Sequence, residues 1–174
     1  MTQRLLAVCF DFGDTLVDQG SEIKDETLTS LSGDLIPGAD DLLRELKRRG
    51  YPLAIVSDGR PGTYHNVLSA YGLYPMFDVY TISELLGCEK PDPRMFHDAM
   101  GRLGISQENY GRVIMVGDSL ERDVKGANGV GMISVWLNWT PRLSQVPADD
   151  SEAPRFIIKR PLDLLAVIES LEAD

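Results

Sequence analysis

Apolar runs of strand length recur along the chain, separated by stretches with helical spacing. The runs are apolar almost throughout, which is typical of strands buried on both faces of a parallel sheet. Five of them predict strands, at residues 5–10, 53–57, 79–82, 113–117 and 133–137, and a weaker sixth run lies at 156–159.

The stretches between these runs predict helices. Residues 39–50, "ADDLLRELKRRG", begin with acids and end with bases and a glycine, which suits the helix dipole and a glycine C-cap. Similar patterns lie at residues 62–72, 92–104, 121–128 and 161–171. This alternation predicts an α/β fold, a three-layer Rossmann-like domain with a parallel sheet of about five strands. No repeat or boundary is evident, so we expect one domain over residues 1–174.

Two polar segments interrupt the alternation. Residues 19–36 form a polar connection with room for a short helix, and residues 141–155 are rich in Pro, Ser and Asp, which is typical of a surface loop. The gaps 16–38 and 60–88 are too short to hold a substantial extra domain beside the predicted elements.

Charge and cysteine content narrow the possible partners. The formal net charge is −10, which argues against nucleic acid because phosphate backbones need a basic face. Cys9 and Cys88 form no CxxC pair, which favours a reducing compartment. The first apolar run meets Asp11 too soon for a signal peptide or a membrane span. We therefore expect a cytoplasmic protein with no membrane partner.

Polar residues follow each of the first four predicted strands. In a parallel sheet the carboxyl ends of the strands share one edge, so these side chains should lie close together. They are Asp11, Gly13, Asp14 and Thr15, then Ser57, Asp58 and Gly59, then Lys90, and finally Asp118, Ser119 and Asp123. Clustered carboxylates without His or Cys suit Mg²⁺. His65 and His97 lie in helical patterns, so a Ser-His-Asp triad has no support.

A lysine and hydroxyl groups beside a Mg²⁺ site indicate a phosphate, because Mg²⁺ usually shares substrate phosphates. A carboxylate near such a phosphate can act as a nucleophile and form an aspartyl-phosphate. The residues alone therefore predict metal-assisted phosphoryl transfer.

Four segments together resemble the haloacid dehalogenase superfamily, most of whose members are Mg²⁺-dependent phosphatases. They are "DFGDT" at residues 11–15, "LAIVSDG", "CEKPDPRMF" and "GDSLERD", in the family's order. The resemblance covers nearly the whole chain. It implies that Asp11 is the nucleophile. It also implies a Mg²⁺ site formed by Asp11, Asp118, Asp123 and the carbonyl of Gly13, and a phosphate site formed by Ser57, Asp58, Gly59 and Lys90.

The first motif departs from the family pattern. In the family, an acid two residues after the nucleophile donates a proton to the leaving group. Here that position is Gly13, and Asp14 stands at the next position, where glycine is usual. Such acid–base help is typically worth about 10²–10⁴ in rate. Either Asp14 supplies it as a further catalytic residue, or the chain is a catalytically impaired phosphate- or metal-binding protein. We expect slow turnover of alkyl phosphates, good turnover of aryl or acyl phosphates, and a gain on alkyl phosphates in Gly13→Asp.

The resemblance also bears on what covers the site. Many relatives carry a cap domain, and the short gaps predict a capless protein. Its partner would be a small phosphorylated substrate, a phosphorylated macromolecule, or a second subunit in a homo-oligomer. For Trp136 and Trp139, packing is favoured over a place at the rim. A receiver-type signalling domain fits the strand order poorly, and a true dehalogenase would lack the metal that "GDSLERD" implies.

Overall fold

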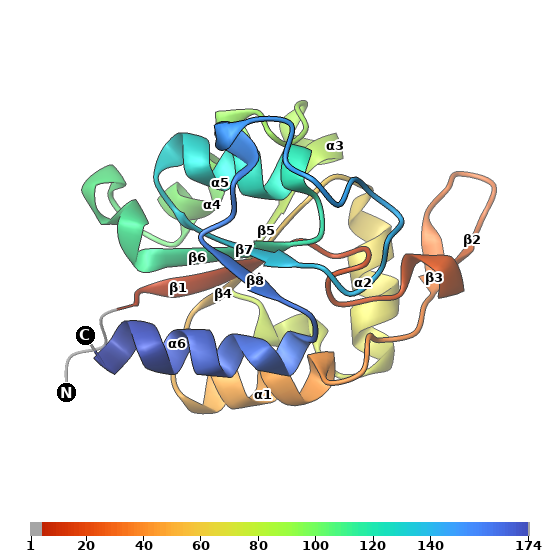
Figure 1. Ribbon diagram of the computed structural model, residues 1–174. Coiled ribbons are helices and arrows are strands. Elements are labelled where there is room, and N and C mark those ends of the chain that lie inside the picture. Colours follow the sequence, from red (N-terminus) through yellow and green to blue (C-terminus); the bar gives the residue numbers. More distant parts are fainter. Residues whose placement is uncertain (1–4, 174) are drawn as a thin grey trace.

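The computed structural model describes residues 5–173, and within them six parallel strands form one sheet (Figure 1). The strands lie in the order β5-β4-β1-β6-β7-β8. Their bounds are β1 (Ala7–Phe10), β4 (Leu53–Ser57), β5 (Val79–Ile82), β6 (Val113–Gly117), β7 (Ile133–Leu137) and β8 (Phe156–Ile158). The five predicted strands are confirmed, and the weak sixth run forms β8 at one edge.

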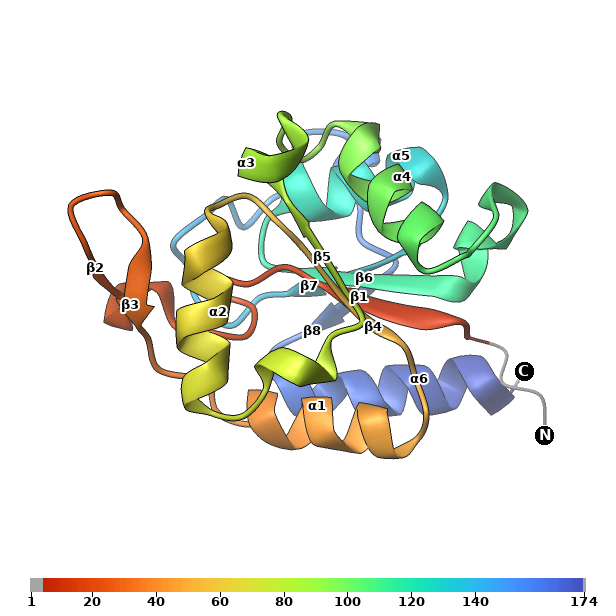
Figure 2. The same ribbon diagram turned by 180° about the vertical axis from the view of Figure 1, so that it is seen from behind.

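Helices cover both faces of the sheet (Figures 1 and 2). One core contains side chains of α1 (Ala39–Arg48), α2 (Pro61–Ala70) and α6 (Leu164–Ala173), and the other contains those of α4 (Pro93–Arg102) and α5 (Lys125–Val130). Successive residues of β1 alternate between the two: Val8 and Phe10 enter the first core, and Ala7 and Cys9 the second. The three-layer α/β architecture is therefore confirmed.

Helix α1 shows how the sequence pattern produces the element. Its buried side chains lie on one face and pack into the core; they are Ala39, Leu42, Leu43 and Leu46. Acids occupy its first turn and bases its last. The predicted helix at 121–128 begins as a π-helical turn, η4 (Leu120–Val124), before α5. The predicted helix at 161–171 begins as a 3₁₀ turn, η6 (Pro161–Asp163), before α6. Short elements without a sequence prediction are α3 (Ser83–Leu86), η2 (Tyr74–Met76) and η3 (Gln107–Arg112).

The polar connection 19–36 holds more structure than the sequence indicated. A 3₁₀ turn, η1 (Gln19–Ser21), satisfies the expectation of a short helix, and the antiparallel strands β2 (Ile23–Lys24) and β3 (Ser30–Ser32) follow it. The backbone N–H of Ser30 donates to Thr63 Oγ1 at 2.9 Å, which ties this hairpin to α2. The predicted surface loop near 141–155 is irregular except for η5 (Asp150–Glu152).

Strand β1 lies between β4 and β6. The residues that follow these three neighbouring strands therefore emerge at the same edge of the sheet. No helix in residues 5–173 is long and apolar enough to cross a membrane.

Candidate active site

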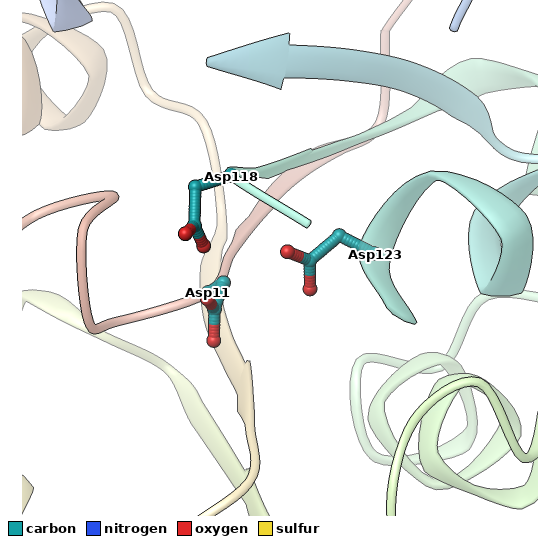
Figure 3. A group of neighbouring side chains, drawn as sticks. All are labelled: Asp11, Asp118 and Asp123. Atoms are coloured by element: carbon teal, nitrogen blue, oxygen red, sulfur yellow. The ribbon is translucent and has the colours of Figure 1, made fainter. Parts of the chain in front are cut away.

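Three carboxyl groups meet at this edge of the sheet. Asp11 directly follows β1, Asp118 directly follows β6, and Asp123 lies in η4. One carboxylate oxygen from each residue lies within 4.8 Å of the others. Figure 3 shows the three side chains converging on one space.

Lys90 joins the carboxyl groups from a different part of the chain. Its Nζ donates to Asp11 Oδ1 at 2.8 Å and to Asp123 Oδ1 at 2.6 Å, and its side chain is only 2% exposed. The other oxygen of Asp123 accepts from the backbone N–H of Ser119 at 3.0 Å. The main chain of Lys90 is held too, because its N–H donates to Asp58 Oδ1 at 2.9 Å.

The pKa values of these groups show an excess of negative charge. Burial raises the pKa of Asp118 to about 9, and the charges of Asp11 and Asp123 add to the rise. Burial likewise raises the pKa of Asp123 to about 7 against the opposing effect of Lys90. Burial alone would raise the pKa of Asp11, but the Lys90 charge and hydrogen bond hold it below its ordinary value. One ammonium therefore does not offset three carboxylates.

The donor set fits a hard divalent cation. It consists of carboxylate oxygens, the ligands that Mg²⁺ prefers, and contains no His or Cys. A cation beside the three carboxylates would favour the charged form of Asp118, against the burial and the neighbouring carboxylates that raise its pKa.

Ser57, at the carboxyl end of β4, accepts a hydrogen bond from Tyr64. The phenol of Tyr64 donates to Ser57 Oγ at 2.9 Å, and burial raises the pKa of this phenol, so it keeps its proton. Ser57 Oγ accepts this bond and keeps its own hydrogen for another acceptor. Tyr64 is a buried residue of α2, and no sequence motif indicates its contact with Ser57.

A pocket of about 200 Å³ lies over this cluster. Its lining residues are Asp11, Gly13, Gln19, Ser57, Asp58, Lys90, Asp118, Ser119, Arg122, Asp123 and Leu143. Most of the predicted site residues line it, together with three that the sequence did not indicate: Gln19, Arg122 and Leu143. Of these, only Arg122 lay inside a recognised motif.

Gly59 lies apart from this pocket. It lines a neighbouring open cleft of about 530 Å³ that shares Asp58 and Arg122 with the first pocket. Its backbone N–H donates to Ser83 Oγ at 2.9 Å, so that donor is not directed at a phosphate. Gly59 also lines a third pocket together with Ser57 and Asp58, so it lies near the predicted phosphate-binding residues although its N–H is directed elsewhere.

Asp14 also lies outside the pocket lining. Its φ of 54° is in the left-handed region, which Asp tolerates better than most residues and which explains why the family usually has glycine there. Its buried carboxylate accepts from the backbone N–H of Gln19 at 3.0 Å and from Arg142. The carboxylate is therefore engaged by structural partners and is not presented to the pocket, contrary to the reading that it replaces the missing acid.

The two tryptophans differ in environment. Trp136 is 4% exposed and packs with Leu120 and Val124, and its Nε1 donates to the carbonyl of Asp118 at 2.9 Å. Trp139 is partly buried against the main core, with Arg142 over its ring. Trp136 is thus a packing residue that also fixes the backbone of a site carboxylate.

A family model described as haloacid dehalogenase-like hydrolase matches residues 20–131, and the chain belongs to this family. The match includes Ser57, Lys90, Asp118 and Asp123 and begins after the first motif. The unusual order Gly13-Asp14 therefore lies outside the matched segment.

Known phosphatases are among the similar proteins. Glyceraldehyde 3-phosphate phosphatase of Methanopyrus kandleri is 35% identical over 141 residues, which cover 81% of this chain and 58% of the relative. Phosphoserine phosphatase of Thermus thermophilus is 38% identical over 104 residues, covering 60% and 44%. The chain spans about half the length of the curated relatives it matches.

The fold is shared with solved structures. A haloacid dehalogenase-type phosphatase from Thermococcus onnurineus superposes with a TM-score of 0.76 and 21% identity, over 94% of this chain and 98% of that one.

Proposed function

We propose that the protein is a Mg²⁺-dependent phosphatase that hydrolyses phosphate monoesters or acyl phosphates through an aspartyl-phosphate on Asp11. One observation carries the proposal: Asp11 lines a pocket where it contacts Lys90 and approaches the carboxylates of Asp118 and Asp123. A nucleophilic carboxylate needs positive charge beside it to meet an anionic phosphate, and Lys90 together with a Mg²⁺ held by the carboxylates would supply it.

Asp11, Asp118 and Asp123 would hold the Mg²⁺, with the carbonyl of Gly13 as a further ligand. When bound, the metal offsets the charge of the transferring phosphoryl group. Lys90 adds a second positive charge beside Asp11, and its contact with Asp123 holds the ammonium in place.

Ser57 and the backbone N–H of Asp58 would bind the phosphate oxygens. Ser57 Oγ receives its hydrogen bond from Tyr64 and can donate its own hydrogen to the substrate. The names of the relatives refer to small phosphorylated molecules, and a pocket of about 200 Å³ suits a substrate of that class.

The reaction would proceed in two displacements. A carboxylate oxygen of Asp11 attacks phosphorus, and the bond from phosphorus to the leaving-group oxygen breaks. Water then attacks the phosphorus of the acyl phosphate, the bond to the Asp11 oxygen breaks, and inorganic phosphate and the free carboxylate are formed. The low pKa of Asp11 keeps the nucleophile ionised.

A second candidate is a phosphate- or metal-binding protein of the same family without turnover. The observation that favours it is Gly13, since the residue that should protonate the leaving group has no side chain. This candidate shares the metal site and differs in the absence of catalysis.

Hydrolysis of p-nitrophenyl phosphate with Mg²⁺ and then with EDTA separates the two. We expect Mg²⁺-dependent turnover that is lost in Asp11→Asn and kept in Asp34→Asn, an exposed control. Mass spectrometry of acid-quenched enzyme should find the phosphoryl group on the peptide that contains Asp11. No turnover in any condition would support the second candidate, and turnover unchanged in Asp11→Asn would exclude the aspartyl-phosphate.

A further inference from the structure

The space beside Gly13 is filled by another residue. A Cβ atom placed on Gly13 would lie 3.5 Å from Cδ and from Oε1 of Gln19 and 3.8 Å from its Cβ. These are ordinary van der Waals distances, so the Gln19 side chain packs against the face of Gly13 from which a side chain would project. Both residues line the pocket that contains Asp11.

Gln19 is held there by the residue that replaces the family's glycine. The backbone N–H of Gln19 donates to Asp14 Oδ1 at 3.0 Å, and Asp14 in turn pairs with Arg142. Arg142 also binds Asp18 at 2.8 Å, next to Gln19 in the chain. The exchange of the two residues in the first motif thus has two linked effects: Gly13 frees a space, and Asp14 anchors the residue that fills it.

The amide of Gln19 is free to act on a ligand. In residues 5–173 it has no protein hydrogen-bond partner, and its NH₂ group carries two donors. An amide does not transfer a proton at neutral pH, but it can donate a hydrogen bond to an oxygen on which charge develops.

We infer that the side-chain amide of Gln19 occupies the place of the absent acid and donates a hydrogen bond to the leaving-group oxygen of the substrate. The inference rests on the proposed phosphatase activity. The leaving group then departs as an anion, stabilised by this bond, and takes its proton from water afterwards. Because no residue protonates the leaving group, the site favours leaving groups of low basicity, and the hydrogen bond from Gln19 extends its range toward more basic ones.

A series of aryl phosphates with leaving groups of increasing pKa tests the hydrogen bond. Gln19→Leu removes the donor and leaves a shorter apolar side chain at this position. Because the lost hydrogen bond is made to an oxygen on which charge develops, kcat should fall roughly tenfold to a hundredfold, most for the most basic leaving groups, with little change in KM. Gln107→Leu, on η3 at the opposite end of β6, is the matched control. An equal loss for every leaving group, or no loss, would overturn the inference.

A double-mutant cycle tests the placement without relying on turnover. A carboxylate in Gly13→Asp would extend into the space of Gln19, so this variant should lower Tm more in the parent than in Gln19→Ala. A separate turnover measurement gives a second test of the placement. The increase in alkyl phosphate hydrolysis expected for Gly13→Asp should reach its full size only when Gln19→Ala is present as well. Strictly additive changes in Tm would show that the two side chains do not share the space.

The two experiments keep the inference distinct from the proposed function. One outcome is that the parent protein shows no Mg²⁺-dependent turnover, while the Tm changes of Gly13→Asp and Gln19→Ala are not additive. The proposed function then fails and the placement of Gln19 stands. If turnover is present but the leaving-group dependence of Gln19→Leu matches the parent, the phosphatase stands and the role of Gln19 is wrong.

Discussion

Lys90 Nζ lies 2.6 Å from Asp123 Oδ1, and the two side chains are only 2% and 1% exposed. An ion pair so far removed from water depends on both partners, because a lone buried charge has neither solvent nor counter-ion. Removal of either partner therefore destabilises the fold, in addition to its effect on the proposed chemistry.

Lys90→Met should destabilise the protein by about 3–5 kcal/mol, because it leaves Asp123 and Asp11 without their ammonium. Urea unfolding with EDTA present measures the loss. Arg44→Met, which breaks an exposed pair with Asp40, is the control and should cost less than about 1 kcal/mol. Equal losses in the two variants would contradict the importance given to burial.

Gly117→Ala should disturb the carboxylate cluster by direct overlap. A Cβ at Gly117 would fall inside the carboxyl group of Asp123, which Lys90 and Ser119 hold in place. Such overpacking typically costs about 1–3 kcal/mol, and Mg²⁺ binding should weaken with it. Gly101→Ala is the control: nothing lies within 4 Å of its added Cβ, and in α4 it should gain about 0.5–1 kcal/mol. A Tm for Gly117→Ala at or above that of the parent would be inconsistent with this packing.

Mg²⁺ should raise Tm, and EDTA should reverse the rise. At a concentration 100 times Kd, binding to the folded state alone stabilises by about 2.7 kcal/mol. Asp118→Asn should abolish the shift while leaving the metal-free protein as stable as before or more so, because the pKa of Asp118 is raised to about 9 and its charged form is disfavoured by burial. Asp34→Asn should keep the shift. A full Mg²⁺ response in Asp118→Asn would exclude Asp118 as a ligand.

Glu45 should make stability depend on pH. Hydrogen bonds from Arg48 and Arg49 lower its pKa from 4.5 to about 2. A carboxyl group whose pKa is lower in the folded state stabilises above its unfolded pKa, and this effect is lost as pH falls through the folded pKa. Glu45→Gln should therefore melt below the parent at pH 7, and the gap should close between pH 4.5 and about 2. Glu26→Gln, in an exposed turn, should show no such trend. A gap that stays constant down to pH 3 would contradict this origin.

The strand ends were the predictable part of the site. Asp11 and Asp118 follow buried parallel strands, and strands of one sheet bring such residues to a common edge whatever their separation in sequence. Lys90 was found by its motif, although a helix separates it from β5. Its contact with Asp123 depends on how the segment between α3 and α4 packs against η4. The hydrophobic pattern of the sequence does not encode that packing.

The less predictable part lies in irregular backbone. Gln19 reaches the pocket because η1 turns the chain back toward Gly13, and Arg142 reaches Asp14 from a loop whose composition indicated only solvent exposure. The direction of the Asp14 carboxylate depends on its positive φ. In the first motif, glycine and aspartate stand in the reverse of the family's order. This reversal gives Asp14 a structural role that the residue type alone did not reveal.

The central position of β1 has a consequence for biosynthesis. Strand β1 is synthesised before its neighbour β6, which is complete only at Gly117, and Asp123 follows later still. A nascent chain that has not reached these residues carries isolated aspartates with no ion-binding constellation. A divalent ion would therefore bind at the proposed site only after the chain has been made as far as Asp123 and the three carboxyl groups have come together.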